Sequence, residues 1–205
     1  FMQSALMLPF VITLRLWTVP SGTLVLQAIR GLLLAMATVF FFAALKHLPM
    51  AEAIAIFFAQ PMILTMLSAF MLGERLRARR IGAIVVGLVG TLIIVQPTIL
   101  IFGWPAVLPL GSALSMALYM VLTRKLTSDV NPSQMQFLGS VAARIGLGLV
   151  VLAGTVFSIS GATMSMLTER EVMWVVGMGI AATLGHAFIV FAAEKAPANL
   201  LAPFQ

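Results

Sequence analysis

The feature that most constrains this chain is a run of 21 residues, Ala53 to Gly73, without a charged side chain. At about 1.5 Å per residue, a helix of this length reaches about 30 Å, the thickness of a bilayer's hydrocarbon core. A charged cluster, Glu74 to Arg80, follows and holds four arginines that cannot enter lipid. The next apolar run, Ile81 to Val95, is slightly short for a span, but Arg79 and Arg80 can extend it by reaching back to the headgroups.

Composition supports the same interpretation for the whole chain. Hydrophobic residues make up 61% of it and charged residues only 9%, whereas a soluble domain carries about 25% charged residues. Short runs of alternating polarity, which the strands of a membrane barrel would need, are absent. The sequence therefore predicts an all-α integral membrane protein.

Further apolar runs extend the pattern to both ends of the chain. Phe1 to Leu16 reads as the tail of a span, and Leu200 to Gln205 as the start of one that is not completed. Gln96 and Pro97 are expected to end the helix that follows the arginine cluster. Complete spans are expected at Leu24–Leu45, Phe102–Leu122, Gln136–Phe157 and Val172–Ala193.

The basic residues are distributed unevenly between the two sides of these spans. One set of loops holds nine of them: Arg15, Arg30, Arg75, Arg77, Arg79, Arg80, Arg124, Lys125 and Lys195. The other set holds two, Lys46 and Arg170. Because loops rich in lysine and arginine stay in the cytoplasm, the first side is assigned as cytoplasmic. The net charge of +6 is thus explained by loop residues that set the orientation of the protein in the membrane, and no nucleic acid partner is expected.

An internal repeat is visible in two segments that each end a span with Ala-Ala-x-Lys before a proline turn. Phe42 to Ala51 resembles Phe191 to Ala198 with one residue deleted. The charge count puts Lys46 outside and Lys195 inside, so the two copies point in opposite directions. Inverted repeats with a site near the membrane midplane are typical of secondary transporters.

The order of several motifs resembles the EamA-type drug/metabolite transporter superfamily. They are FFAALKHLPMAEA, LGERL, RRIGAIVVGLVGTLIIVQP, SALSMALYMVLTRKL and AAEKAPANLLAPFQ. The resemblance implies ten helices in two inverted five-helix repeats. Residues 1–98 would be a first repeat lacking its first helix, and residues 99–205 a second repeat lacking most of its last two. Family members move metabolites, amino acids, vitamins or drugs across the bacterial inner membrane.

We therefore expect a multi-pass inner-membrane secondary transporter that moves a small solute by alternating access. The alternative is a non-transporting scaffold or assembly subunit. The seam of small residues Ala83, Gly87 and Thr91 permits a partner helix, including one from a homodimer. No enzyme activity, metal or other cofactor is expected, because the chain has no cysteine and its acids and histidines form no catalytic or metal-ligand pattern.

A stripe of hydroxyl side chains is expected on the span Phe102–Leu122. Its members are Ser112, Ser115, Tyr119 and Thr123, which share one helix face at 100° per residue. The stripe either lines a wet central cavity that contacts substrate, or its hydroxyls bond to carbonyls four residues back or on a neighbouring helix.

Two further candidates for substrate binding lie at membrane depth. His186 can bind substrate or relay a proton, or it can be a neutral histidine bonded to a neighbouring helix. Gln60 precedes Pro61, which frees a backbone carbonyl near Phe57, so this point is either a break that lines the site or a simple kink.

Glu52 and Arg144 complete the candidate substrate-binding set. Glu52 lies at the outer mouth of its helix, where it contacts substrate, couples to protons, or is a favourable acid in a first turn. Arg144 pairs with an anionic substrate group if its helix starts at Gln136, and reaches the cytoplasmic surface if the helix starts later.

Overall fold

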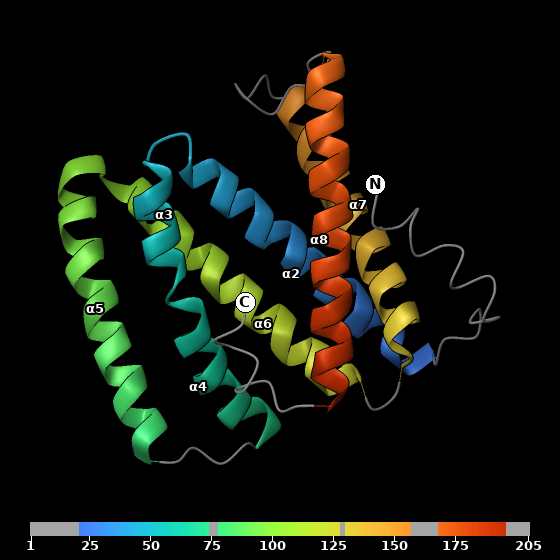
Figure 1. Cartoon of the computed structure of the whole chain (residues 1–205), viewed down its shortest axis with the longest axis horizontal. Coiled ribbons are helices and arrows are strands. Elements are labelled where there is room, and N and C mark those ends of the chain that lie inside the picture. The colour runs from blue at the N-terminus through green and yellow to red at the C-terminus, as the bar shows by residue number, and fades with distance from the viewer. Residues whose placement is uncertain (1–20, 74–77, 128–129, 157–167, 196–205) are drawn as a thin grey trace. The chain divides into compact units, whose positions relative to one another are not determined.

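The computed structural model describes residues 21–73, 78–127, 130–156 and 168–195 (Figure 1). Within these ranges the regular elements are all helices: η1 (Ser21–Thr23), α2 (Leu24–Ala44), α3 (Met50–Phe57), α4 (Gln60–Leu72), α5 (Ala78–Phe102), η2 (Trp104–Val107), α6 (Leu108–Leu126), α7 (Pro132–Val156) and α8 (Glu169–Lys195). The predicted all-α fold class is confirmed. The runs Phe1–Leu16 and Leu200–Gln205, and most of the arginine cluster, lie outside the described residues.

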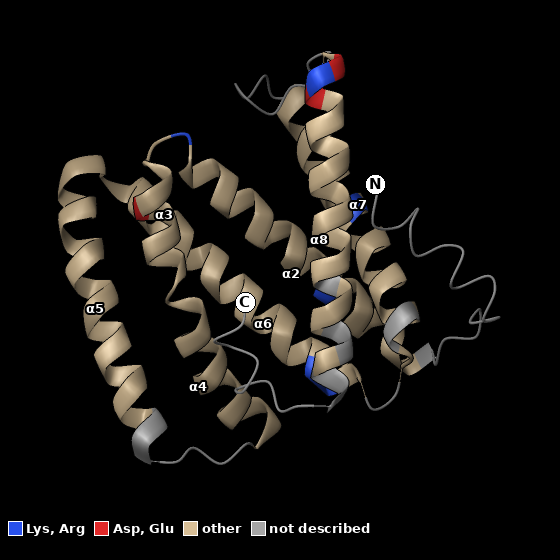
Figure 2. Ribbon diagram, viewed as in Figure 1, with Lys and Arg blue, Asp and Glu red and all other residues tan. Residues whose placement is uncertain are grey.

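Six segments among the described residues are long and apolar enough to cross a membrane: Leu24–Ala44, Met50–Leu72, Ile81–Phe102, Trp104–Leu126, Gln134–Val156 and Glu169–Ile189. Figure 2 draws these helices almost entirely in tan because charged side chains are rare within them. Large apolar side chains point outward, including Phe70 at 84% exposed and Leu100 at 79%. Such faces are stable in lipid, so the protein crosses the membrane several times.

The helices gather into two compact units. The first holds α2 up to Ala35 together with α7 and α8, and the second runs from Met36 to Lys125 and so holds α3 to α6. Spatial units of this kind need not coincide with sequence repeats. The division into repeats after residue 98, which falls inside α5, and their inversion therefore stay predictions.

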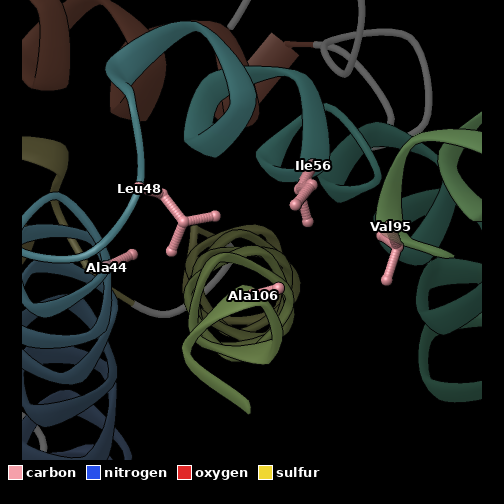
Figure 3. Packing of buried hydrophobic residues seen from close by; sticks show 5 residues of the cluster. All are labelled: Ala44, Leu48, Ile56, Val95 and Ala106. Atoms are coloured by element: carbon pink, nitrogen blue, oxygen red, sulfur yellow. The ribbon is translucent and has the colours of Figure 1, made fainter. Parts of the chain in front are cut away.

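The core of the second unit lies where four elements meet. Ala44 of α2, Leu48 of the following turn, Ile56 of α3, Val95 of α5 and Ala106 of η2 form one buried cluster (Figure 3). α5 packs against both α3 and α4. The short turn at residues 45–49 folds α3 back beside α2, as the sequence predicted, and this fold-back lets one cluster serve both helices.

The expected helix end at Gln96 and Pro97 is wrong, because α5 continues through Pro97 to Phe102. Proline has no N–H, so Pro97 removes one helical hydrogen bond. The next residue, Thr98, donates a 2.7 Å hydrogen bond from its hydroxyl to the Ile94 carbonyl. The carbonyl that Pro97 leaves without a helical donor is that of Ile93, four residues back, so the Thr98 bond is an additional one. Spanning helices tolerate a proline of this kind, and the continuation gives α5 the length that Ile81–Val95 lacked.

The expected span Phe102–Leu122 is displaced along the chain. Phe102 belongs to α5, Gly103 follows with φ 73°, and the next apolar segment runs from Trp104 to Leu126. A positive φ is readily adopted by glycine and ends a helix there. The charged pair Arg124 and Lys125 therefore forms the last turn of α6 rather than a loop.

Arg30 was counted among the cytoplasmic loop residues, and this placement is wrong. It lies within α2, seven residues into the helix, and is only 1% exposed. Without Arg30, eight basic residues remain on the side assigned to the cytoplasm and two on the other, so the charge bias is kept and the orientation stays a prediction.

Candidate functional site

The predicted site residues fall into both units. Gln60, Ser115, Tyr119 and Glu52 belong to the second unit, and Arg144 and His186 to the first. Each unit therefore carries polar side chains within its spans.

Gln60 lies at a true interruption of its span. α3 ends at Phe57, α4 starts at Gln60, and Ala59 N–H bonds to the Ile56 carbonyl three residues back instead of four. Pro61 sits in the first turn of α4, where its missing N–H costs nothing. The Gln60 side chain is buried at 2% exposed. The expected break is therefore present and positions a buried amide in the middle of the span.

The buried face of α4 continues this polar line. Thr65 donates a 2.7 Å hydrogen bond to the Pro61 carbonyl, and Ser68 donates one of 3.1 Å to the Thr65 carbonyl. Both side chains are buried. Neither residue was among the predicted site residues, although their spacing of four and seven residues from Pro61 is visible in the sequence.

Glu52 lies in the first turn of α3, one turn before Ile56 of the buried cluster. Its residue is half-buried, and its Oε2 atom is buried without a hydrogen-bond partner. A carboxylate oxygen without a partner is costly inside a protein, and the role of Glu52 in substrate binding stays a prediction.

The hydroxyl stripe of α6 is fully enclosed, since Ser112, Ser115, Tyr119 and Thr123 are each 4% exposed or less. Ser115 and Thr123 donate to the carbonyls four residues back, at 2.8 Å and 2.7 Å. Ser112 donates across to the Ala37 carbonyl of α2 at 2.7 Å. These are the bonds of the non-functional alternative, and they occupy three hydroxyl donors. A role for the stripe in substrate binding stays a prediction and would use the hydroxyl oxygens as acceptors.

Arg144 lies deep within its helix. α7 starts at Pro132, so Arg144 is about 18 Å along the helix axis from its start. The later helix start that the surface-reaching alternative required is not present. Arg144 is half-buried and has interaction partners within the chain, and its pairing with substrate stays a prediction.

His186 belongs to α8, but its side chain lies outside the described part of the chain. Thr183, one turn earlier on the same face, is 1% exposed and donates a 2.6 Å hydrogen bond to the Gly179 carbonyl. The proposed role of His186 stays a prediction.

The first unit also holds a polar cluster that was not among the predicted site residues. Gln27 and Arg30 of α2 and Gln136 of α7 are each 2% exposed or less. The Arg30 guanidinium Nη1 donates a 2.8 Å hydrogen bond to the Met135 carbonyl. The signal in the sequence was Arg30 itself, the one charged residue in the apolar run that starts at Leu24. A charge within a membrane span usually marks a functional site.

Glycines allow the two helices of this cluster to approach closely. A Cβ atom at Gly31 would lie 2.5 Å from Ala142 Cβ and 2.6 Å from the Gly139 carbonyl oxygen. A Cβ atom at Gly139 would collide with the Arg30 guanidinium. Small residues at such crossings let membrane helices pack backbone to backbone, and here they also leave room for the arginine.

Apolar helices with outward-facing hydrophobic side chains define a multi-pass membrane protein, and each of its two units also buries polar side chains. Residues 1–96 match the family model described as the EamA-like transporter family. The resemblance to EamA-type drug/metabolite transporters is thereby confirmed over this part of the chain.

Known relatives carry transporter names. The chain is 29% identical to a riboflavin transporter of Rhizobium johnstonii, over 86% of this chain and 56% of that protein. It is 26% identical to an uncharacterized transporter of Helicobacter pylori, over 87% of this chain and 59% of that protein. A shorter segment of 55 residues is 40% identical to an aromatic amino acid exporter of Ancylobacter novellus, covering 27% of this chain and 19% of that protein.

The chain thus spans less than two thirds of the length of the first two relatives. No solved structure matches the chain at a significant level.

Proposed function

We propose that this protein is a secondary transporter that moves a small solute across the bacterial inner membrane by alternating access. The observation that carries the proposal is the burial of uncharged and charged polar groups, such as Gln60 and Arg30, inside helices whose outer faces are apolar. Burying such groups in a membrane is unfavourable unless they serve one another or a ligand. A scaffold has no need of a polar interior.

The break between α3 and α4 supports a moving part in this mechanism. Interrupted spanning helices are typical of transporter sites, because their free backbone groups and altered direction serve both binding and motion. Pro61 cannot donate to the Phe57 carbonyl, so this helical hydrogen bond does not join α3 to α4. A proton gradient or solute exchange would bias the cycle, and the carboxylate of Glu52 is a candidate proton carrier.

A small aromatic metabolite is the proposed substrate class. The named substrates of two relatives, riboflavin and aromatic amino acids, both contain planar aromatic rings. Gln60 and Tyr119 are buried and carry an amide and a phenol, polar groups of the kind that orient a ligand in a small-molecule site.

The test is transport by the full-length protein in liposomes, with labelled riboflavin and labelled tryptophan as separate probes. We expect protein-dependent accumulation of one of the two. Gln60→Leu should lower the initial rate at least tenfold, while Gln96→Leu, which makes the same change at an exposed position of α5, should leave it unchanged. Uptake of both probes equal to that of empty liposomes would contradict the proposal and favour the scaffold alternative.

A further inference from the structure

A buried polar cluster lies between the first two turns of α2 and the first two turns of α7. Arg30 is 1% exposed, and Gln27 and Gln136 are each 2% exposed. Arg30 Nη1 donates to the Met135 carbonyl at 2.8 Å and lies 3.5 Å from Gln27 Oε1, the outer limit of a hydrogen bond. A positive charge and two amides are thus gathered within one helical turn of each other.

The two glutamines are not satisfied by the protein. The Nε2 atom of Gln27 is buried without a hydrogen-bond partner, and so are both the Nε2 and Oε1 atoms of Gln136. Almost all buried polar side-chain atoms in folded proteins have a partner, because an unpaired one destabilises the fold. Unpaired groups that persist beside a buried charge indicate a binding partner that is not part of the chain.

The electrostatic setting favours an anion. α2 and α7 run in the same direction, since Arg30 meets Met135 and Gly139 near the helix starts while Leu32 and Ala35 meet Gly146 further along. Gln27 and Met135 are each the fourth residue of their helix. The partial positive charges of both helix N-termini therefore add to that of Arg30.

We propose that this cluster binds the carboxylate group of a small organic anion. The Gln27 and Gln136 amide N–H groups donate to the carboxylate oxygens, and the guanidinium balances the single negative charge. The Gln136 Oε1 atom accepts a hydrogen bond from an N–H or O–H elsewhere on the ligand. Binding of the carboxylate stands on its own, whereas identification of the cluster as a substrate site rests on the proposed function.

Binding is tested by thermal unfolding of the full-length protein in detergent, with sodium benzoate as the probe. Benzamide keeps the ring but removes the charge, and sodium chloride matches the salt. We expect benzoate to raise the Tm by several degrees with saturation, because it binds only the folded state. Benzamide and sodium chloride should not change the Tm. An absent benzoate shift, or an equal shift with benzamide, would overturn the proposal.

Gln136→Leu separates a ligand site from a structural role. It removes two unpaired buried atoms while keeping the size of the side chain. The ligand-free Tm should therefore rise, and the benzoate shift should disappear. The matched control is Gln134→Leu, at a buried residue that has a partner, which should lower the ligand-free Tm and keep the benzoate shift.

Arg30→Met should also abolish the benzoate shift. If Arg30→Met does not fold, the comparison of Gln136→Leu with Gln134→Leu still tests whether the cluster binds the carboxylate. A Gln136→Leu protein with a lowered ligand-free Tm and a retained benzoate shift would refute the site. Benzoate binding without any solute transport would support the carboxylate site and reject the proposed transport function. Transport without a benzoate shift would support the transport function and reject the carboxylate site.

Discussion

The guanidinium of Arg30 in α2 is hydrogen-bonded to the backbone carbonyl of Met135 in α7, at 2.8 Å, within apolar membrane-spanning segments. The two residues are 105 positions apart in the chain. Gly139 lies one turn beyond Met135 and leaves the space that the guanidinium occupies. The contact fixes the crossing of α2 and α7 and turns an arginine inward that would otherwise have to reach the membrane surface.

Gly31→Ala should lower the stability of the protein by about 1–3 kcal/mol, because the added methyl group meets the Gly139 carbonyl and Ala142 in a crowded crossing. The measurement is equilibrium unfolding in mixed micelles. Gly148→Ala is the control in α7, since a Cβ atom there meets nothing within 4 Å. Equal losses for both variants would show that the crossing is looser than described.

Ser112→Ala should cost about 1 kcal/mol, because its hydroxyl joins α6 to the Ala37 carbonyl of α2. Ser115→Ala should change stability by less than about 0.5 kcal/mol, since its hydroxyl bonds only within its own helix. Thermal unfolding of the two variants gives the comparison. A substrate role for Ser115 would instead appear as reduced transport at unchanged Tm, and unchanged transport would remove it from the site.

Pro61→Ala should affect motion more than stability. Proline is well tolerated in a first helical turn, so the Tm should change little, while the new N–H can bond to the Phe57 carbonyl and join α3 to α4. We expect slower amide hydrogen exchange at residues 58–62 and a reduced transport rate. Pro97→Ala in the uninterrupted α5 is the control and should leave transport unchanged. Full transport with the joined helix would argue against a hinge.

Gly87→Ala should destabilise the protein only while Met62 is present, because a Cβ atom at Gly87 would collide with the Met62 sulfur of α4. In a Met62→Ala background the same change should cost at least about 0.5 kcal/mol less, a coupling that a double-mutant cycle measures. Gly90→Ala, with open space around it, serves as the uncoupled control. Additive effects would mean that Gly87 does not pack against α4.

The contact between Gly87 and Met62 also concerns the seam of small residues Ala83, Gly87 and Thr91. The sequence offered this seam to a partner helix, including one from a second copy. At Gly87 the neighbour is Met62 of the same chain, and Thr91 donates its hydroxyl to the Gly87 carbonyl. The expected homodimer stays a prediction, and a surface for it has to be sought on other faces.

The sequence by itself determined the features that depend on local chemistry. Uncharged runs long enough for a bilayer predicted the membrane helices, and Pro61 predicted the break before α4, because both follow from residues close together in the chain. The helix end at Pro97 was wrong because a spanning helix tolerates the loss of one backbone hydrogen bond at a proline, so the residue type alone does not decide where α5 ends.

The tertiary structure decided which polar residues share an interior. Arg30 is a lone charge within an apolar run until α7 is placed beside it, and Gln27 and Gln136 are ordinary glutamines until the fold buries amide atoms of both without partners. Ser112 and Ser115 look equivalent in sequence, but only one reaches another helix. Burial and hydrogen bonding across 75 to 105 residues of chain depend on how helices pack, and no local pattern carries that information.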